Sequence, residues 1–184
     1  MVSFRKLPNI IITGTPGCGK TSHAEEFVSQ NPEFTHINVS EFAKKNDCIE
    51  GYDEDRDSSI VNEDRLLDIL EPLSEKGGLV IDWHCCEIFP ERWIDLVVVI
   101  RCDNTVLYNR LEARGYKQSK ITENVECEIM QILLTEAMEN YNSNIVVELN
   151  SESLDSLDEN VSRISQWVEM WKENNPNGIS NELD

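Results

Sequence analysis

The sequence feature that most constrains this chain is an eight-residue stretch near its start, GTPGCGKT at positions 14–21. It fits the phosphate-loop pattern, in which a glycine is followed by four residues and then by Gly-Lys-Thr. The apolar residues 10–12 before it are typical of a buried parallel strand, and residues 22–27 are expected to form the helix that follows. A phosphate loop between a strand and a helix indicates a bound nucleoside triphosphate, because backbone N–H groups and the positive helix end face phosphate oxygens. The alternative is a glycine-rich turn that binds nothing.

Two side chains of this loop have expected roles toward ATP. Lys20 would reach the β- and γ-phosphates, and the hydroxyl of Thr21 would coordinate Mg²⁺. Phosphoryl transfer also needs a metal-holding acid, cations around the migrating phosphate and a site for the acceptor. The rest of the chain offers a candidate for each of these parts.

Asp82 is the candidate for the metal-holding acid. It ends the apolar run 79–81, as a Walker B carboxylate does at the carboxyl end of a strand beside the phosphate loop. Its alternative role is to cap an ordinary turn. His84 lies two residues further on and could position a water or carry a proton. On spacing alone, a purely structural role for His84 fits equally well.

Three arginines are candidates for neutralising phosphate charge. Arg92 follows the Asp82 segment and could bind the phosphate of an acceptor. Arg110 and Arg114 lie four residues apart and share one helix face just before Gly115, which suits a lid that closes over phosphates. The alternative for this pair is a solvated helix face balanced by acidic side chains.

Length and composition favour one α/β domain over residues 1–184. A chain of 184 residues can build one complete core, and its aliphatic runs alternate with amphipathic stretches, as in a parallel sheet flanked by helices. No apolar run approaches the ~20 residues of a membrane span, so no membrane association is expected. The six cysteines lack the paired spacing of a zinc site, and free thiols in a reducing compartment are expected.

The charge of the chain is strongly acidic. The sequence has 35 acidic and 16 basic residues, which gives a formal net charge of −19. Such a chain is repelled by nucleic-acid phosphates, so direct binding through a basic face is not expected, whereas a basic protein would be attracted. Solubility alone is an equally good reason for the acidity.

Periodicity and turn residues predict the remaining elements. Ser40 is expected to cap a short helix, residues 47–62 to form an exposed mobile loop, and residues 174–184 to form a disordered tail. The other expected elements are strands at 34–39, 94–100 and 145–149 and helices at 63–76, 104–114, 122–141 and 154–173.

With these residues placed, the chain resembles the adenylate kinase isoenzyme 6 family, also described as the coilin-interacting nuclear ATPase family. The resemblance covers nearly the whole chain. The matching stretches are PNIIITGTPGCGKT at 8–21, EGYDE at 50–54, IDWH at 81–84, FPERW at 89–93, LEARGY at 111–116 and the segment 167–171.

The resemblance implies a P-loop nucleoside monophosphate (NMP) kinase fold, with an NMP-binding segment near 38–61 and a short lid near 113–123. It implies transfer of phosphate from ATP, with Mg²⁺, to AMP or a related monophosphate, together with ATP hydrolysis. It also implies a place in the nucleus and cytoplasm. There, members of the family assist maturation of the small ribosomal subunit and its precursors through the basic ribosomal protein S14 (uS11).

The same resemblance assigns the site residues. Asp82 and His84 match the Walker B-like pair of the family, and Arg114 matches its lid arginine. The residues that match its ATP contacts are Gly17, Cys18, Gly19, Lys20, Thr21, Ser22 and Arg114. The expected catalytic residues are Lys20, Asp82, His84 and Arg114, and the expected metal-binding residues are Thr21 and Asp82.

Ser40 and Arg92 are the expected contacts of the monophosphate, and here the chain departs from ordinary adenylate kinases. Glu91 interrupts the usual Phe-Pro-Arg run, and Lys44 and Lys45 stand where those enzymes place an arginine. A lysine supplies a point charge rather than a two-pronged clamp.

Two other functions fit parts of the pattern. The first is an ATP-driven ribosome-assembly factor that binds a basic ribosomal protein and keeps only residual kinase activity. The second is a metabolite kinase similar to shikimate kinase, which fits the phosphate loop but not the IDWH and FPER stretches.

Overall fold

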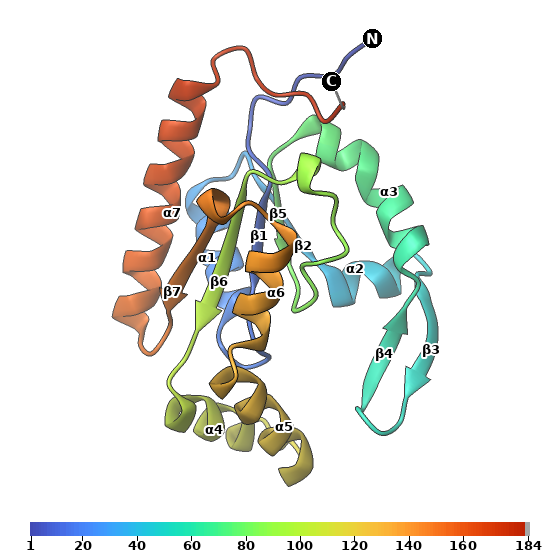
Figure 1. Ribbon diagram of the computed structural model, residues 1–184, viewed down its shortest axis with the longest axis vertical. Helices are drawn as coiled ribbons and strands as arrows, with labels where there is room; N and C mark the ends of the chain where they lie inside the picture. Colours follow the sequence, from blue (N-terminus) through green and yellow to red (C-terminus); the bar gives the residue numbers. More distant parts are fainter. Residues whose placement is uncertain (183–184) are drawn as a thin grey trace.

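The phosphate-loop strand lies at the centre of a parallel sheet in the computed structural model, which describes residues 1–182 (Figure 1). Strand β1 (Ile10–Thr13) pairs with β5 (Leu79–Asp82) on one side and with β6 (Leu96–Arg101) on the other. Strands β2 (Thr35–Asn38) and β7 (Val146–Asn150) complete the order β2-β5-β1-β6-β7. The predicted α/β fold with a parallel sheet is confirmed.

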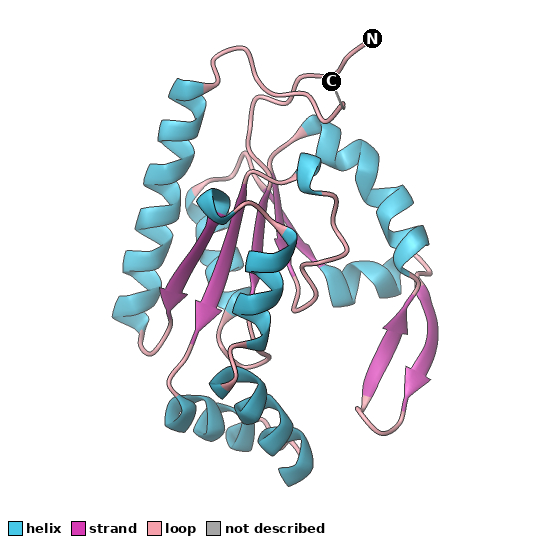
Figure 2. Ribbon diagram, in the orientation of Figure 1, coloured by secondary structure: helices cyan, strands magenta, loops and turns pink. Residues whose placement is uncertain are grey.

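The sheet is buried on both faces because alternate side chains enter two separate apolar clusters. Ile11 belongs to one cluster, and Ile10 and Ile12 belong to the other. Figure 2 shows the strands of this sheet as one layer with helices around it. The first cluster includes residues of α2 (Val39–Lys45), α3 (Glu63–Lys76) and α6 (Ile132–Asn140), and the second includes residues of α1 (Lys20–Gln30), α4 (Asn104–Ala113), α5 (Gln118–Ile129) and α7 (Leu154–Asn174). Burial on both sides explains why these strands read as continuous apolar runs.

The carboxyl ends of the strands share one edge of the sheet, the lower edge in Figure 1, and both chain termini lie at the other end. The loops that follow the strands therefore meet at the lower edge. This is the edge at which open α/β sheets bind their ligands.

Residues 47–62 are not the mobile loop that the sequence predicts. They form an antiparallel hairpin of β3 (Ile49–Asp53) and β4 (Ser58–Val61), which projects beside the main sheet in Figure 1. Side chains along both strands are exposed or only half-buried. A ribbon with so little buried surface has no strong apolar alternation, and this is why its acidic sequence looks like a loop.

Two helix boundaries also differ from the prediction. The expected single helix over 122–141 is two helices, α5 and α6, because Gln131 adopts a left-handed backbone with φ of 57°. Ser40 does not cap α2: the cap is Asn38, whose side-chain oxygen accepts a hydrogen bond from the Glu41 backbone N–H at 3.2 Å. Two short 3₁₀ turns, η1 (Glu91–Trp93) and η2 (Ser143–Ile145), lie in the connections before β6 and β7.

The expected disordered tail at 174–184 is wrong for residues 174–182. Ile179 pairs with Arg5 through backbone hydrogen bonds, and the buried Asn181 side chain accepts from Arg5 Nε at 2.8 Å. Residues 183–184 lie outside the described part. The reason for the error is that Arg5 and Asp95 form a buried ion pair on which the tail closes, a long-range contact with no local signal.

Two expectations from composition can be compared with the described chain. All six cysteines are free thiols. Within residues 1–182, the helices are too short or too polar to cross a membrane.

Candidate active site

Parallel pairing of β1 and β5 brings the phosphate loop to Asp82. Ile12 of β1 lies opposite Asp82, so the loop that leaves β1 passes beside the carboxylate. The hydroxyl of Thr21 donates to Asp82 Oδ2 at 2.7 Å, and Asp82 is only 3% exposed. The two residues expected from the sequence to hold Mg²⁺ are therefore in direct contact.

This pair fits Mg²⁺ by its chemistry. A hydroxyl and a carboxylate are hard oxygen ligands, and Mg²⁺ in nucleotide sites uses one or two protein oxygens together with substrate phosphates. In the described part of the chain, no group of three or more His, Cys, Asp or Glu side chains could hold a metal by itself. The donor set suits a metal that shares its coordination sphere with ATP.

The phosphate loop depends on glycine at two of its turns. Gly14 has a φ of +152°, and a Cβ there would lie 2.6 Å from the carbonyl oxygen of Ile100. Gly19 has a φ of +101° and is the residue from which α1 begins. Both positions need a residue without a side chain, so the loop can turn tightly into the positive end of a helix.

Lys20 lies at the start of α1 and is partly buried. Burial lowers the pKa of Lys20, and the negative charge of Asp82 opposes this shift. Among residues 1–182, none of the ion pairs includes Lys20. An ammonium group that has lost water without gaining a direct carboxylate partner is favoured to bind an anion such as a phosphate.

Cys18 contributes to the loop through its backbone. Its N–H donates to the carbonyl oxygen of Thr15 at 3.0 Å, and its side chain is fully buried. Cys18 therefore shapes the loop, and its thiol is not available to a nucleotide on the surface.

A pocket of about 340 Å³ opens between the phosphate loop and the start of α7, and we call it the α7-side pocket. It brings together four of the expected ATP contacts. Arg110, which lies one helical turn before Arg114, also donates through Nη1 to the carbonyl oxygen of Gly17 at 3.4 Å. The lining residues are Gly17, Gly19, Ser22, His23, Arg110, Arg114, Ser151, Ser153, Leu154 and Leu157.

A second pocket of about 700 Å³ lies on the opposite side of the loop, between the hairpin and the end of β5, and we call it the hairpin-side pocket. Ser40, Lys44 and His84 line it, together with Tyr116 from the expected lid. Lys120 Nζ of the expected lid donates at 3.3 Å to the carbonyl oxygen of Asp57, a residue that lines this pocket. The segments expected to bind the monophosphate and to form the lid are therefore already in contact.

His84 faces the open hairpin-side pocket, and its side chain is exposed. Protein atoms around the ring still desolvate the charged imidazole and, with the nearby Lys20 ammonium, lower the pKa of His84 to about 4. The ring is thus neutral near pH 7 and can both donate and accept a hydrogen bond. It can orient a water or hydroxyl group, but it is a weak proton acceptor.

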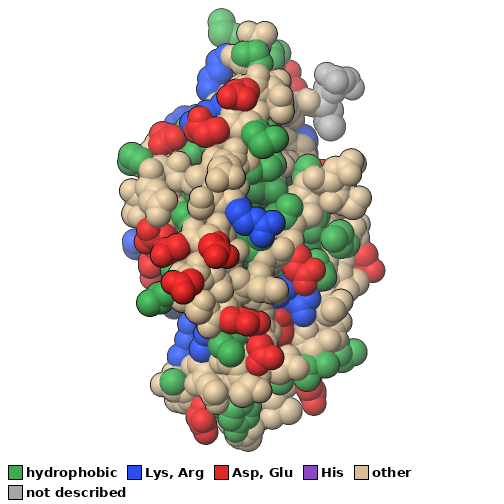
Figure 3. All heavy atoms as spheres, turned by 90° about the vertical axis from the view of Figure 1, so that its left-hand side faces the viewer, with side chains coloured by type: hydrophobic (Ala, Val, Ile, Leu, Met, Phe, Trp, Pro, Cys, Tyr) green, Lys and Arg blue, Asp and Glu red, His purple; other side chains and the backbone are tan. Residues whose placement is uncertain are grey.

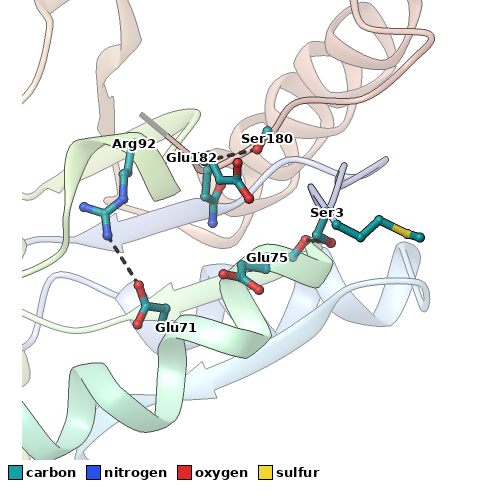
Figure 4. A pocket seen from close by; sticks show the side chains of 8 residues that line it. Ser3, Glu71, Glu75, Arg92, Ser180 and Glu182 are labelled. Atoms are coloured by element: carbon teal, nitrogen blue, oxygen red, sulfur yellow. Dashed lines mark hydrogen bonds and ion pairs between the residues drawn. The ribbon is translucent and has the colours of Figure 1, made fainter. Parts of the chain in front are cut away.

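Arg92 is not part of this site, which corrects the expectation that it binds the monophosphate. It lies in η1, before β6, and therefore at the amino-terminal edge of the sheet, on the far side from the phosphate loop. Its Nη2 pairs with Glu71 Oε1 at 3.3 Å in a pocket of about 510 Å³ beside the chain termini (Figure 4). Arg92 was misplaced because residues 83–90 return the chain from one edge of the sheet to the other.

A buried carboxylate, Glu128, holds the other flank of the phosphate loop and was missed from the sequence. Thr15 Oγ1 donates to Glu128 Oε2 at 2.6 Å, and Arg101 Nε donates to Glu128 Oε1 at 2.5 Å. The backbone N–H of Cys102 also donates to Oε1 at 3.3 Å. Glu128 is 2% exposed and joins α5 to the loop and to the end of β6. A lone glutamate in an amphipathic helix gives no sign of such a role.

His36 of β2 is the second residue that sequence reasoning missed. Its Nε2 lies 3.0 Å from Asp82 Oδ2, the same oxygen that accepts from Thr21. Only the strand order β2-β5-β1 could have revealed it, because β2 and β5 are separated along the chain by α2, the hairpin and α3.

Comparison with known proteins places the chain among P-loop proteins. A family model described as an AAA domain matches residues 10–131. Two solved structures share its fold at low identity. A shikimate kinase from Bacteroides thetaiotaomicron has a TM-score of 0.55 and 14% identity over 89% of this chain and 99% of that one. A gluconokinase from Sinorhizobium meliloti has a TM-score of 0.51 and 17% identity over 92% and 98%.

Curated relatives are much more similar in sequence. The adenylate kinase isoenzyme 6 homolog HBR1 of Candida albicans is 56% identical over all of this chain and 77% of its own length. The homolog FAP7 of Saccharomyces cerevisiae is 55% identical over 99% of this chain and 92% of its own length. A homolog from Drosophila melanogaster is 43% identical over 90% and 94%.

The hydrogen bond from Thr15 to Glu128 is expected to stabilise the folded protein. Thr15→Val keeps the shape of the side chain but removes the hydroxyl, which leaves the buried Oε2 of Glu128 without its donor. We expect the free energy of unfolding in urea to fall by about 1–3 kcal/mol. Thr15→Ser keeps the hydroxyl and serves as the control. Equal stability of the Val and Ser variants would contradict the role assigned to this hydrogen bond.

Proposed function

Because the chain belongs to the adenylate kinase isoenzyme 6 family, we propose that it transfers the γ-phosphate of ATP to AMP or a related nucleoside monophosphate. We propose that it also hydrolyses ATP when water takes the place of the acceptor. Its shared fold with other P-loop kinases agrees with this class of reaction.

The observation that carries the proposal is the pair of pockets on either side of the phosphate loop. Direct transfer between two nucleotides needs two sites whose phosphates meet at one point. In the sheet order β2-β5-β1-β6-β7, the loop leaves the central strand. The α7-side pocket lies toward β7, and the hairpin-side pocket lies toward β5 and β2. ATP would occupy the first pocket and the monophosphate the second.

Residues of this chain would act mainly by positioning and by charge. Lys20 would contact the β- and γ-phosphates, and Arg114 would close over them from the end of α4. Mg²⁺, bound by Thr21 and the phosphates and oriented by Asp82, would neutralise the developing negative charge.

On the acceptor side, Ser40 and Lys44 would bind the monophosphate, because they line the hairpin-side pocket and Arg92 does not reach it. The neutral His84 would orient the attacking group, a phosphate oxygen during transfer or a water during hydrolysis. Lys44 is a point charge where ordinary adenylate kinases have an arginine, which predicts weak and less selective binding of the acceptor.

We also propose that this activity serves maturation of the small ribosomal subunit, in the nucleus and cytoplasm, through the basic ribosomal protein S14 (uS11). The family resemblance supports this, and so does the formal net charge of −19, which attracts basic partners. Figure 3 shows acidic side chains spread over the face that carries α7, with basic ones among them. The rival proposal is an ATP-driven assembly factor with only residual kinase activity.

One assay separates the two proposals. ADP formation is measured with ATP alone, with added AMP, and with the purified basic ribosomal protein. We expect AMP to accelerate turnover, with ADP formed from both nucleotides, and Lys20→Ala to abolish turnover because the phosphates lose their cation. If AMP has no effect and only the ribosomal protein changes turnover, the assembly-factor proposal is correct. Failure of the wild type to bind ATP would refute both proposals.

The acceptor side is tested by a matched pair of cation substitutions. Lys44→Ala removes one of the two cations that line the hairpin-side pocket, the other being Arg56. We expect it to raise the KM for AMP about tenfold, which corresponds to about 1.4 kcal/mol. Arg92→Ala removes a cation at the opposite edge of the sheet and is expected to leave the KM for AMP unchanged. Steady-state kinetics at saturating ATP give both values. A larger effect of Arg92→Ala would show that the acceptor site has been placed wrongly.

A further inference from the structure

The Asp82 carboxylate is held by two different elements through one oxygen atom. Oδ2 accepts from the Thr21 hydroxyl at 2.7 Å and lies 3.0 Å from His36 Nε2. Asp82 is 3% exposed, and the His36 side chain is 18% exposed. Because a carboxylate oxygen can only accept, Nε2 must carry the hydrogen in this contact. Thr21 belongs to α1, whereas His36 belongs to β2.

Strand pairing explains why this histidine reaches the aspartate. His36 lies opposite Val80, and Asn38 lies opposite Asp82 in the parallel pair of β2 and β5. Side chains two residues apart on a strand share one face, so His36 is the diagonal neighbour of Asp82 on the same face of the sheet. The contact is thus fixed by register and does not depend on a flexible loop.

Two donors from two elements restrain a carboxylate more than one donor does. A single hydrogen bond from Thr21 leaves the carboxylate free to turn about its Cβ–Cγ bond. The second bond, from His36 of β2, limits that rotation and keeps Oδ2 turned toward His36 and Thr21. Oδ1 has no protein hydrogen-bond partner among the described residues and is left for a metal-bound water.

We infer that His36 is a positioning residue, which holds the Asp82 carboxylate in the orientation that the Mg²⁺–ATP complex requires. The inference rests on the proposed function, because it assumes that Asp82 orients the metal. It makes a distinction that the proposed function does not: loss of His36 should weaken binding of ATP with Mg²⁺, and should leave binding of ATP without Mg²⁺ unaffected. Among the described residues, the side chain of His36 makes its hydrogen bond to Asp82, and His36 and Thr21 line the same small pocket.

The test compares two substitutions of His36 by direct binding measurements. His36→Phe keeps a ring but removes the donor, whereas His36→Gln can place an amide N–H near the position of Nε2. ATP affinity is measured by titration calorimetry in excess EDTA and again across a series of Mg²⁺ concentrations. For His36→Phe we expect the half-saturating Mg²⁺ concentration to rise about fivefold, which is the typical net contribution of one hydrogen bond. Affinity in EDTA should stay within about twofold of the wild type. His36→Gln should recover most of the Mg²⁺ response.

Thr35→Val is the matched control, because Thr35 is the exposed neighbour on the same strand and its side chain points to the opposite face. It should leave both binding measurements unchanged.

Equal loss of affinity with and without Mg²⁺ in His36→Phe would show a general structural role and overturn the inference. An unchanged Mg²⁺ response, or no recovery in His36→Gln, would also overturn it. These outcomes differ from failure of the proposed function, which would appear in the wild type itself, either as no binding of ATP with Mg²⁺ or as no effect of AMP on turnover.

Discussion

The hydrogen bond between Thr21 and Asp82 is the contact on which the site depends. It exists because β1 and β5 are adjacent parallel strands whose carboxyl ends are level, with Ile12 opposite Asp82. These strands are stable side by side because both faces of the sheet are covered. One apolar cluster contains Ile11 of β1, and the other contains Ile10 and Ile12. The pair expected to hold Mg²⁺ therefore depends on the whole core, although its two residues are 61 positions apart in the chain.

The phosphate loop is held on its other flank by a second polar contact of the same kind. Glu128 is buried and bonded to Thr15, and Arg101 neutralises it from the end of β6. A buried charge is tolerated only when it is paired and hydrogen-bonded, so these three groups depend on one another. Glu128 belongs to α5, a helix that begins inside the expected lid, so the lid is joined through this helix to the loop that it would cover. Movement of the lid and order in the loop are thus expected to be coupled.

Sequence patterns predict the parts of this protein that are set by local chemistry. The apolar runs predicted the strands of the sheet. The glycine pattern and the strand-terminal Asp82 identified the central residues of the candidate site, Lys20, Thr21 and Asp82. Contacts between distant segments could not be predicted. Arg92 was expected beside the phosphate loop but lies at the opposite edge of the sheet, because the return of the chain after His84 has no local sequence signal. His36 and Glu128 were missed because their partners are set by strand order and helix docking. The hairpin at 47–62 was taken for a loop because an exposed ribbon lacks a buried face.

We propose that Mg²⁺ and the phosphates of ATP meet where Thr21 and Asp82 touch, between two pockets that hold the two nucleotides. A crystal structure with Mg²⁺ and a non-hydrolysable ATP analogue tests it most directly. We expect a metal about 2.0–2.1 Å from Thr21 Oγ1, with Asp82 facing one of its waters and the nucleoside of ATP in the α7-side pocket. A metal bound away from Thr21, or a nucleoside in the hairpin-side pocket with the triphosphate outside the loop, would contradict it.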